Sequence, residues 1–176
     1  MTRTQELLRL STRDHLTGLY NRGYLRERVA IEVNRARRTG QPLAIAMIDV
    51  DRFKFFNDTH GHAAGDQVLN AIAAVLRSAF RTTDVVSRYG GEEFVVAMPD
   101  TDVAAAAHTL ERVRQSIEST PTHTSGGRSV SVTISAGVAG FPNDGTKEED
   151  LLAVADARLF AAKADGRNRI VDASRS

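Results

Sequence analysis

The stretch that most constrains the fold is Arg81 to Val96, which reads RTTDVVSRYGGEEFVV. Two short β-forming segments flank a Gly-Gly pair, a pattern typical of a β-hairpin. Glycine at the tip, at Gly90 and Gly91, allows a positive φ and leaves no Cβ above the turn, so a ligand can approach closely. Glu92 and Glu93 follow at once, and neighbouring carboxylates repel each other unless a cation or a donor lies between them. The residues alone leave two interpretations open, a solvated acidic hairpin and an acidic binding site.

A second constraint is the unbroken apolar run LAIAMIDV, from Leu43 to Val50. Such a run predicts a central strand that is buried on both faces. Asp49 and Asp51 stand at its carboxyl end and, being two residues apart, point the same way. Uncompensated carboxylates there are costly. One interpretation is that both aspartates cap the following helix, which is sufficient to explain Asp51. The other interpretation is that Asp49 binds a metal ion.

Polar residues suited to a nucleotide follow this run. Lys54 carries a point charge that suits phosphate. Asn57 can donate and accept, and the Asp66 carboxylate matches the N1–H and N2–H donors of guanine while repelling N1 of adenine. Asp66 also precedes an apolar helical stripe, so a helix N-cap is an open alternative. His60 and His62 lie two positions apart and could suggest transition-metal ligands, but without cysteines and with many carboxylates the sequence favours Mg²⁺ or Mn²⁺.

The remaining patterns alternate between helices and strands. Helical periodicity covers residues 22–38, 66–78, 102–119 and 148–164, and 129–139 reads as a strand. Gly166 is expected to cap the last helix, and Lys163 and Arg167 suit a helix C-terminus. Because few strands are joined by helical crossovers and a hairpin occupies the middle, the order favours an α+β fold over a doubly wound sheet.

Composition excludes several classes of protein. The chain has 176 residues, which suits one domain, and 41% hydrophobic residues, which is enough for a core. A net charge of +1 gives no support for nucleic-acid binding or an acidic membrane surface. The absence of cysteine excludes disulfides and thiolate metal sites. No apolar run approaches the roughly 18 residues of a membrane span. We therefore expect a cytoplasmic domain that contacts neither nucleic acid nor membrane.

Together these motifs resemble, in order, those of the GGDEF family, the diguanylate cyclases, in its Gly-Gly-Glu-Glu-Phe variant. The resemblance begins at the segment DHLTGLYNR and runs from about Asp14 to Ile170. It implies a mainly antiparallel sheet of about five strands flanked by helices, like the nucleotidyl cyclase core and the polymerase palm. Residues 14–176 are expected to form the GGDEF catalytic domain. Residues 1–13 are expected to end a signalling helix that follows a sensor domain or another regulator.

The resemblance also implies an activity. Two GTP molecules become cyclic di-3′,5′-GMP and two pyrophosphates, in a homodimer because each domain holds one GTP. The product is expected to inhibit the enzyme. The alternative is a catalytically weak domain that acts as a GTP or cyclic di-GMP receptor or as a dimerisation module.

Residue roles follow from the matching motifs. The resemblance implies that Mg²⁺ or Mn²⁺ is bound by Asp49, the carbonyl of Val50, and Glu92. Glu92 and Lys54 are the candidate catalytic residues, although the identity of the base is open. The substrate-binding candidates are Asn57, His62, Asp66, Gly90, Gly91, Lys163 and Arg167, the last two at the β- and γ-phosphates. The inhibitory site is assigned to Arg81, Asp84 and Arg112. Without the resemblance, Arg81 and Asp84 would be an exposed ion pair of little energetic value.

Overall fold

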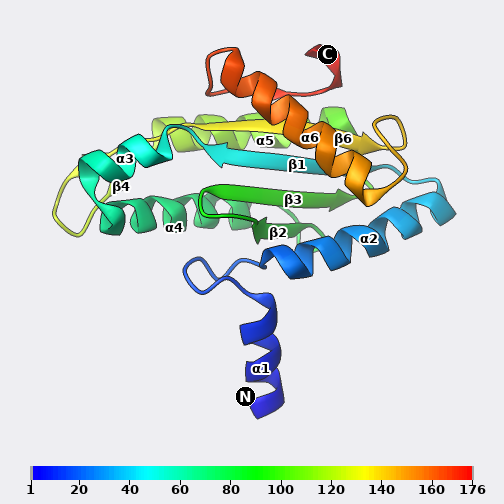
Figure 1. Ribbon diagram of the computed structural model, residues 1–176, viewed down its shortest axis with the longest axis horizontal. Coiled ribbons are helices and arrows are strands. Elements are labelled where there is room, and N and C mark those ends of the chain that lie inside the picture. Colours follow the sequence, from blue (N-terminus) through cyan, green and yellow to red (C-terminus); the bar gives the residue numbers. More distant parts are fainter. Residues whose placement is uncertain (1, 176) are drawn as a thin grey trace.

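A five-stranded sheet lies at the centre of the protein, whose computed structural model describes residues 2–175 (Figure 1). The strands lie in the order β2-β3-β1-β6-β7. Their bounds are β1 Leu43–Val50, β2 Val85–Arg88, β3 Glu93–Pro99, β6 Ile134–Phe141 and β7 Ile170–Val171. All neighbours are antiparallel except β6 and β7. The predicted α+β fold with a mainly antiparallel sheet is confirmed.

Helices cover both faces of this sheet. Their bounds are α1 Arg3–Thr12, α2 Arg22–Thr39, α3 Phe53–His60, α4 His62–Ala79, α5 Val103–Ser119 and α6 Glu148–Ala164, with a short 3₁₀ helix at Ala173–Arg175. A separate two-stranded ribbon pairs β4 Thr122–His123 with β5 Ser129–Val130. The helix α1 projects away from the sheet (Figure 1). Among the helices of residues 2–175, none has both the length and the apolarity needed to cross a bilayer.

The central strand β1 is buried on both faces, which explains why its sequence is apolar without alternation. All eight of its residues are buried. Side chains on one face of β1 pack with α4 and α5 in a first core; these are Ala44, Ala46 and Ile48. Its odd-numbered residues, Leu43, Ile45 and Met47, join a second core with α2 and α6. The prediction of a strand buried on both faces is confirmed, and Asp49 therefore faces the layer of α2 and α6.

Three local predictions are wrong. The segment 129–139 is not one strand, because β5 ends at Val130 and β6 begins at Ile134. The helix predicted from Asp66 begins four residues earlier, after Gly61 (φ 88°), so Asp66 lies inside α4 and is not its N-cap. The C-cap of α6 is Asp165, and Gly166 follows it with a φ of 118°.

Candidate functional site

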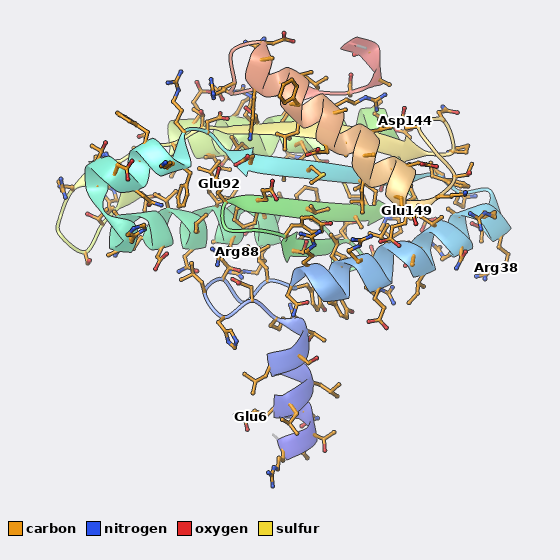
Figure 2. The ribbon with its side chains drawn as sticks, viewed as in Figure 1. Glu6, Arg38, Arg88, Glu92, Asp144 and Glu149 are labelled. Atoms are coloured by element: carbon orange, nitrogen blue, oxygen red, sulfur yellow. The ribbon has the colours of Figure 1, made fainter. Side chains whose placement is uncertain are left out.

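The carboxyl end of β1 meets the β2–β3 hairpin. Asp49 stands directly opposite Glu93 of β3. The Val50 N–H donates to the Glu92 carbonyl at 3.1 Å. Figure 2 shows Glu92 beside the carboxyl end of β1. The fold thus brings together Asp49, Val50 and Glu92, which the sequence places in two separate segments.

The carboxylates at this junction are short of positive charge. Asp49 is only 3% exposed, and its Oδ2 accepts a hydrogen bond from Lys163 Nζ. Its Oδ1 is buried without a hydrogen-bond partner among residues 2–175. Burial, followed by the negative charge and hydrogen bonding of Asp49, raises the pKa of Glu92. Burial and the charge of Asp49 also raise the pKa of Glu93.

These features fit a bound Mg²⁺ or Mn²⁺. Within the described part of the chain, no group of three or more His, Asp or Glu side chains is assembled as a metal cage. Mg²⁺ commonly binds one or two carboxylates together with substrate phosphates and does not need an all-protein cage. An orphaned Asp49 oxygen next to the Glu92 carboxyl group is the donor set such an ion requires.

The hairpin tip corrects the prediction about its glycines. Tyr89 and Gly90 donate backbone hydrogen bonds to the Glu93 carbonyl at 2.8 and 3.3 Å. Neither Gly90 nor Gly91 has a positive φ, so the tip does not need glycine for its backbone conformation. A Cβ at Gly90 would lie 3.0 Å from Glu93 Oε2, and one at Gly91 would meet no atom within 4 Å. The glycines instead leave the tip open to close approach.

The α3–α4 pair presents the polar residues that the sequence assigned to a base. Lys54, His62 and Asp66 are exposed, whereas Asn57 is partly buried. The Asn57 Oδ1 atom is buried, and the structure of residues 2–175 gives it no hydrogen-bond donor. Gly65 makes this arrangement possible, because a Cβ at that position would overlap Asn57 Oδ1. The pair therefore offers an unsatisfied acceptor beside an exposed carboxylate.

The end of α6 supplies the basic residues. Lys163 lies in the last turn and bonds to Asp49, so a helix C-terminus alone does not explain its place. Arg167 follows in the left-handed region, with a φ of 64°, and its N–H donates to the Ala162 carbonyl at 3.0 Å.

Asp51 has a different role from the cap that was predicted. The residue at the N-cap of α3 is Arg52, and no side chain caps that helix. Asp51 accepts hydrogen bonds from Thr133 Oγ1 at 2.7 Å, Ser135 Oγ at 2.6 Å and the Asn168 N–H at 3.0 Å. It therefore ties together the start of α3, the start of β6 and the turn after α6. No local sequence signal pointed to these partners.

Arg88 is a further residue that sequence reasoning missed. Its guanidinium donates to the Gly91 carbonyl at 2.8 and 3.2 Å and to Asp14 Oδ1 at 3.2 Å. Burial alone would raise the pKa of Asp14, but hydrogen bonds from Thr17 and the charge of Arg88 lower it overall. Arg88 thus links the loop after α1 to the hairpin tip (Figure 2).

The predicted inhibitory residues lie away from this junction. Arg81 donates to Asp84 Oδ1 at 3.2 Å, to the Pro99 carbonyl at 2.8 Å and to Thr101 Oγ1 at 2.8 Å. The Arg81 side chain is 56% exposed, but that of Asp84 is only 4% exposed, so the pair is not the surface ion pair that its residues alone suggested.

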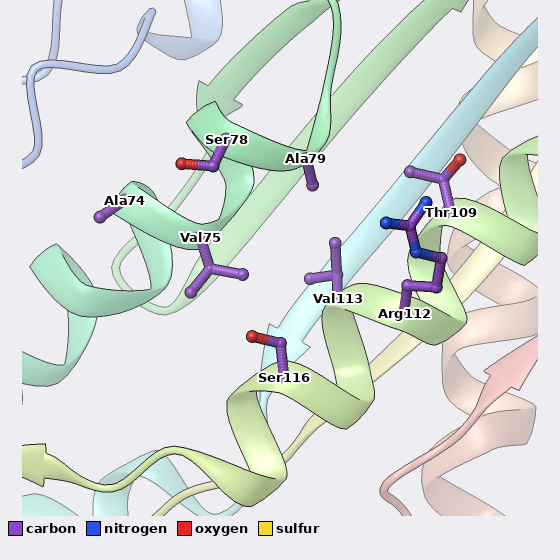
Figure 3. Close-up of a pocket in the computed structure, with 8 residues that line it drawn as sticks. All are labelled: Ala74, Val75, Ser78, Ala79, Thr109, Arg112, Val113 and Ser116. Atoms are coloured by element: carbon purple, nitrogen blue, oxygen red, sulfur yellow. The ribbon is translucent and has the colours of Figure 1, made fainter.

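Arg112 lines a cavity that adjoins the one bordered by Arg81 and Asp84. It lines a space of about 540 Å³ between α4 and α5 (Figure 3). Arg81 and Asp84 line a second space of about 360 Å³. Ala79 and Thr109 line both cavities, so the three predicted residues surround two adjoining spaces.

Known proteins are similar to this chain in sequence and in fold. The model of the family described as "Diguanylate cyclase, GGDEF domain" matches residues 11–169. The chain is 45% identical to the response regulator PleD of Caulobacter vibrioides over 165 residues, which are 93% of this chain and 36% of PleD. It therefore spans about a third of the length of that curated relative.

Solved structures agree with this match. The coiled coil and GGDEF domain of DgcB from Caulobacter crescentus, in complex with c-di-GMP, superposes with a TM-score of 0.91 at 32% identity, covering 97% of this chain and 90% of that one. The active GGEEF domain of a diguanylate cyclase from Vibrio cholerae superposes with a TM-score of 0.80 at 33% identity, covering 86% and 96%. From its motifs, its sheet and a family match over most of its length, the chain belongs to the GGDEF family of diguanylate cyclases.

Proposed function

We propose that this domain condenses two GTP molecules into cyclic di-3′,5′-GMP. The 3′-hydroxyl of each GTP attacks the α-phosphorus of the other, the new P–O bond forms, and pyrophosphate leaves. The observation that carries the proposal is the junction where Asp49, with a buried oxygen that has no partner within residues 2–175, meets Glu92 and Lys163. A buried carboxylate oxygen without a partner is costly, so one at Asp49, beside the Glu92 carboxyl group, favours a ligand-binding role over a structural one.

Mg²⁺ or Mn²⁺ would be held by Asp49, the Val50 carbonyl and Glu92, where it would neutralise phosphate charge and lower the pKa of the attacking hydroxyl. Lys54, Lys163 and Arg167 orient the triphosphate, and Lys54 stabilises the charge that develops on it. Glu92 is our candidate for accepting the proton of the 3′-hydroxyl, because it lies at the junction with Asp49 where that hydroxyl would be activated.

Guanine is read by the α3–α4 pair. Asn57 offers a buried acceptor that the described part of the chain leaves unsatisfied, and Asp66 offers a carboxylate to the N1–H and N2–H donors. A site that depends on such hydrogen bonds rejects adenine strongly, because its own polar groups would be left unpaired. His62, Gly90 and Gly91 complete the pocket for the nucleotide.

Catalysis requires two copies of the chain. Each domain offers one such junction, so two domains must face each other for the two GTP molecules to react. The exposed leucines of α1, Leu7, Leu8 and Leu10, support a partner segment or regulator on this helix. We propose that a sensor domain or another regulator controls the approach of the two copies.

Product inhibition is assigned to Arg81, Asp84 and Arg112, which border the two adjoining cavities. The planar guanidinium suits both phosphate oxygens and the acceptor edge of guanine. Arg112 is the better residue to test, because Arg81 also holds the Pro99 carbonyl. We expect Arg112→Ala to keep the initial rate while raising the cyclic di-GMP concentration that inhibits. Equal inhibition curves for parent and variant would exclude this site.

The proposed reaction is tested by incubating the protein with GTP and Mg²⁺, with ATP as the control substrate, and identifying products by mass. We expect cyclic di-GMP from GTP and no cyclic dinucleotide from ATP. Asp49→Asn and Glu92→Gln should each reduce turnover by at least about 100-fold. Glu149→Gln, at the exposed opposite end of α6, is the matched control and should keep parental turnover. A protein that binds GTP or cyclic di-GMP but forms no product would instead be a receptor.

A further inference from the structure

The turn after α6 has an unusual backbone. Gly166, Arg167 and Asn168 follow one another with positive φ angles of 118°, 64° and 49°. Glycine adopts such angles freely, but a residue with a long side chain, such as arginine, rarely does. Strained residues of this kind persist only where the surrounding structure holds them, and they gather at functional sites. The turn therefore depends on the groups that anchor it.

Hydrogen bonds fix the backbone of this turn at three points. The Arg167 N–H donates to the Ala162 carbonyl of α6 at 3.0 Å, and the Arg167 carbonyl accepts from Arg169 Nε at 3.0 Å. The Asn168 N–H donates to Asp51 Oδ2 at 3.0 Å. The guanidinium of Arg167, by contrast, makes no hydrogen bond or ion pair within residues 2–175. The backbone is held, while the charged side chain is left available to a ligand.

Arg114 of α5 holds the side chain of Asn168. Its Nη1 donates to Asn168 Oδ1 at 2.7 Å, across 54 positions of the sequence. The contact is possible because α5 packs against β6 and β7, and β7 begins two residues after Asn168. The Arg114 side chain is only 13% exposed, although arginine on a helix surface ordinarily stays in water. Asn168 is thus bound by Asp51 through its N–H and by Arg114 through its amide oxygen.

Two glutamates of α5 aim the Arg114 guanidinium. Glu111 accepts from Nε and Nη2 at 3.0 and 2.7 Å, and Glu118 accepts from Nη1 at 2.6 Å. Paired contacts of this kind fix the plane of the guanidinium as well as its place. Hydrogen bonding by Arg114 lowers the pKa of both glutamates, so both stay ionised at neutral pH. Among the described residues, Asn168 is the one partner of this preset guanidinium that lies outside α5.

We propose, on the basis of the function proposed above, that Arg114 is a positioning residue for the terminal phosphates of GTP. By holding Asn168 it fixes the turn, and the neighbouring Arg167 then presents its guanidinium to the β- and γ-phosphates from a preformed backbone. Arg114 itself touches no substrate. Preorganisation of this kind improves affinity because less freedom is lost on binding. It should therefore matter only for a nucleotide that carries these two phosphates, whereas a purely structural tie would affect all guanine nucleotides alike.

The test is isothermal titration of the whole chain, with Mg²⁺ present, using two guanine nucleotides. One is the GTP analogue with a methylene group between its α- and β-phosphorus atoms, which cannot release pyrophosphate. The other is GMP, which lacks the β- and γ-phosphates. We expect the parent to bind the analogue at least about tenfold more tightly than GMP. Arg114→Met should weaken binding of the analogue at least about fivefold and that of GMP less than about twofold.

Two further variants show whether Arg114 acts through Arg167. Arg167→Met should cause the same selective loss. The double variant Arg114→Met/Arg167→Met should bind the analogue as Arg167→Met does, within about twofold, because the contact that Arg114 supports is already gone. Arg38→Met is the matched control, since Arg38 is exposed in the last turn of α2, far from this turn (Figure 2), and both affinities should stay parental.

Two results would overturn the proposal and leave the proposed function standing. One is an Arg114→Met protein that keeps the parental preference for the analogue over GMP while Arg167→Met loses it. The other is a double variant whose losses add. If the parent itself shows no such preference, the phosphate role of Arg167 fails, and the role of Arg114 fails with it. Should Arg114→Met not fold, Arg114→Lys decides in its place: lysine keeps the charge beside the glutamates but lacks the planar fork, so the analogue should bind at least about twofold more weakly.

Discussion

Replacing Gly65 by alanine tests how close packing of α4 holds Asn57 of α3 in place. The added Cβ overlaps Asn57 Oδ1 and lies 3.0 Å from Asn57 Cγ and 3.2 Å from Phe53 Cζ. Gly65 does not have a positive φ, so the alanine backbone itself is unstrained. The substitution therefore forces the Asn57 amide out of its buried position, and we expect GTP affinity to fall.

The effect on stability has two opposing parts. Overpacking of this kind costs about 1–3 kcal/mol. Alanine in place of glycine inside a helix contributes about 1 kcal/mol in the opposite direction. Gly65→Ala should therefore lower the free energy of unfolding by about 0–2 kcal/mol. In an Asn57→Ala background the overlapping amide is gone, and the same substitution should raise the free energy of unfolding by up to about 1 kcal/mol.

The measurement is a double-mutant cycle. Urea unfolding of the parent, Gly65→Ala, Asn57→Ala and the double variant, without nucleotide, gives four free energies of unfolding with a shared m-value. We expect a coupling energy of about 1–3 kcal/mol between the two positions. If Gly65→Ala changes the free energy by the same amount in both backgrounds, within about 0.5 kcal/mol, the packing argument is refuted.

Three further predictions concern other parts of the fold. Gly137→Ala places a Cβ against the backbone of α6 and should cost at least about 3 kcal/mol in urea unfolding, whereas Gly91→Ala, with no atom within 4 Å, should cost less than about 1 kcal/mol; equal midpoints would contradict this. Hydrogen bonding from Arg158 lowers the pKa of Asp144 below its ordinary 3.8, so the pair stabilises the fold above that pH and this contribution is lost as pH falls through the lowered pKa. As the pH is lowered from about 6 to about 3, the free energy of unfolding should therefore fall more steeply for the parent than for Asp144→Asn. Parallel curves would show that the Asp144–Arg158 pair does not contribute to stability. Arg88→Met should reduce the rate of cyclic di-GMP formation by at least about tenfold with the circular dichroism spectrum unchanged, while Arg88→Lys should recover only part of the rate; a parental rate in Arg88→Met would remove its positioning role.

Local patterns were sufficient for most of the secondary structure. The run Leu43–Val50 matches β1 because a strand that is buried on both faces needs no polar alternation. The stripe over Glu148–Ala164 matches α6 because its inward residues recur at helical spacing. The boundary between α3 and α4 was missed because it depends on one glycine, Gly61, inside a polar segment without hydrophobic periodicity.

The site could be predicted only in part. The sequence indicated that Asp49 and Glu92 would meet, and the structure places them together, although their roles stay proposals. The bonds of Asp51 to Ser135 and of Arg88 to Asp14 join residues 84 and 74 positions apart, and such long-range pairs leave no local pattern. The cavity that Arg112 lines likewise depends on how α4 and α5 pack against each other, and not on the spacing of residues within either helix.

The sheet order has a consequence for how the chain folds during synthesis. The central strand β1 pairs on one side with β3, where Leu43 faces Pro99, and on the other with β6, where Leu43 faces Phe141. Neither partner exists until well after β1 has left the ribosome, and the sheet is complete only once β7, at residue 171, has emerged. Such non-local pairing slows folding and leaves an apolar strand without partners in the meantime. A nascent chain that stalls before about residue 141 therefore exposes LAIAMIDV with one edge unpaired, and holdase chaperones should recognise that segment first.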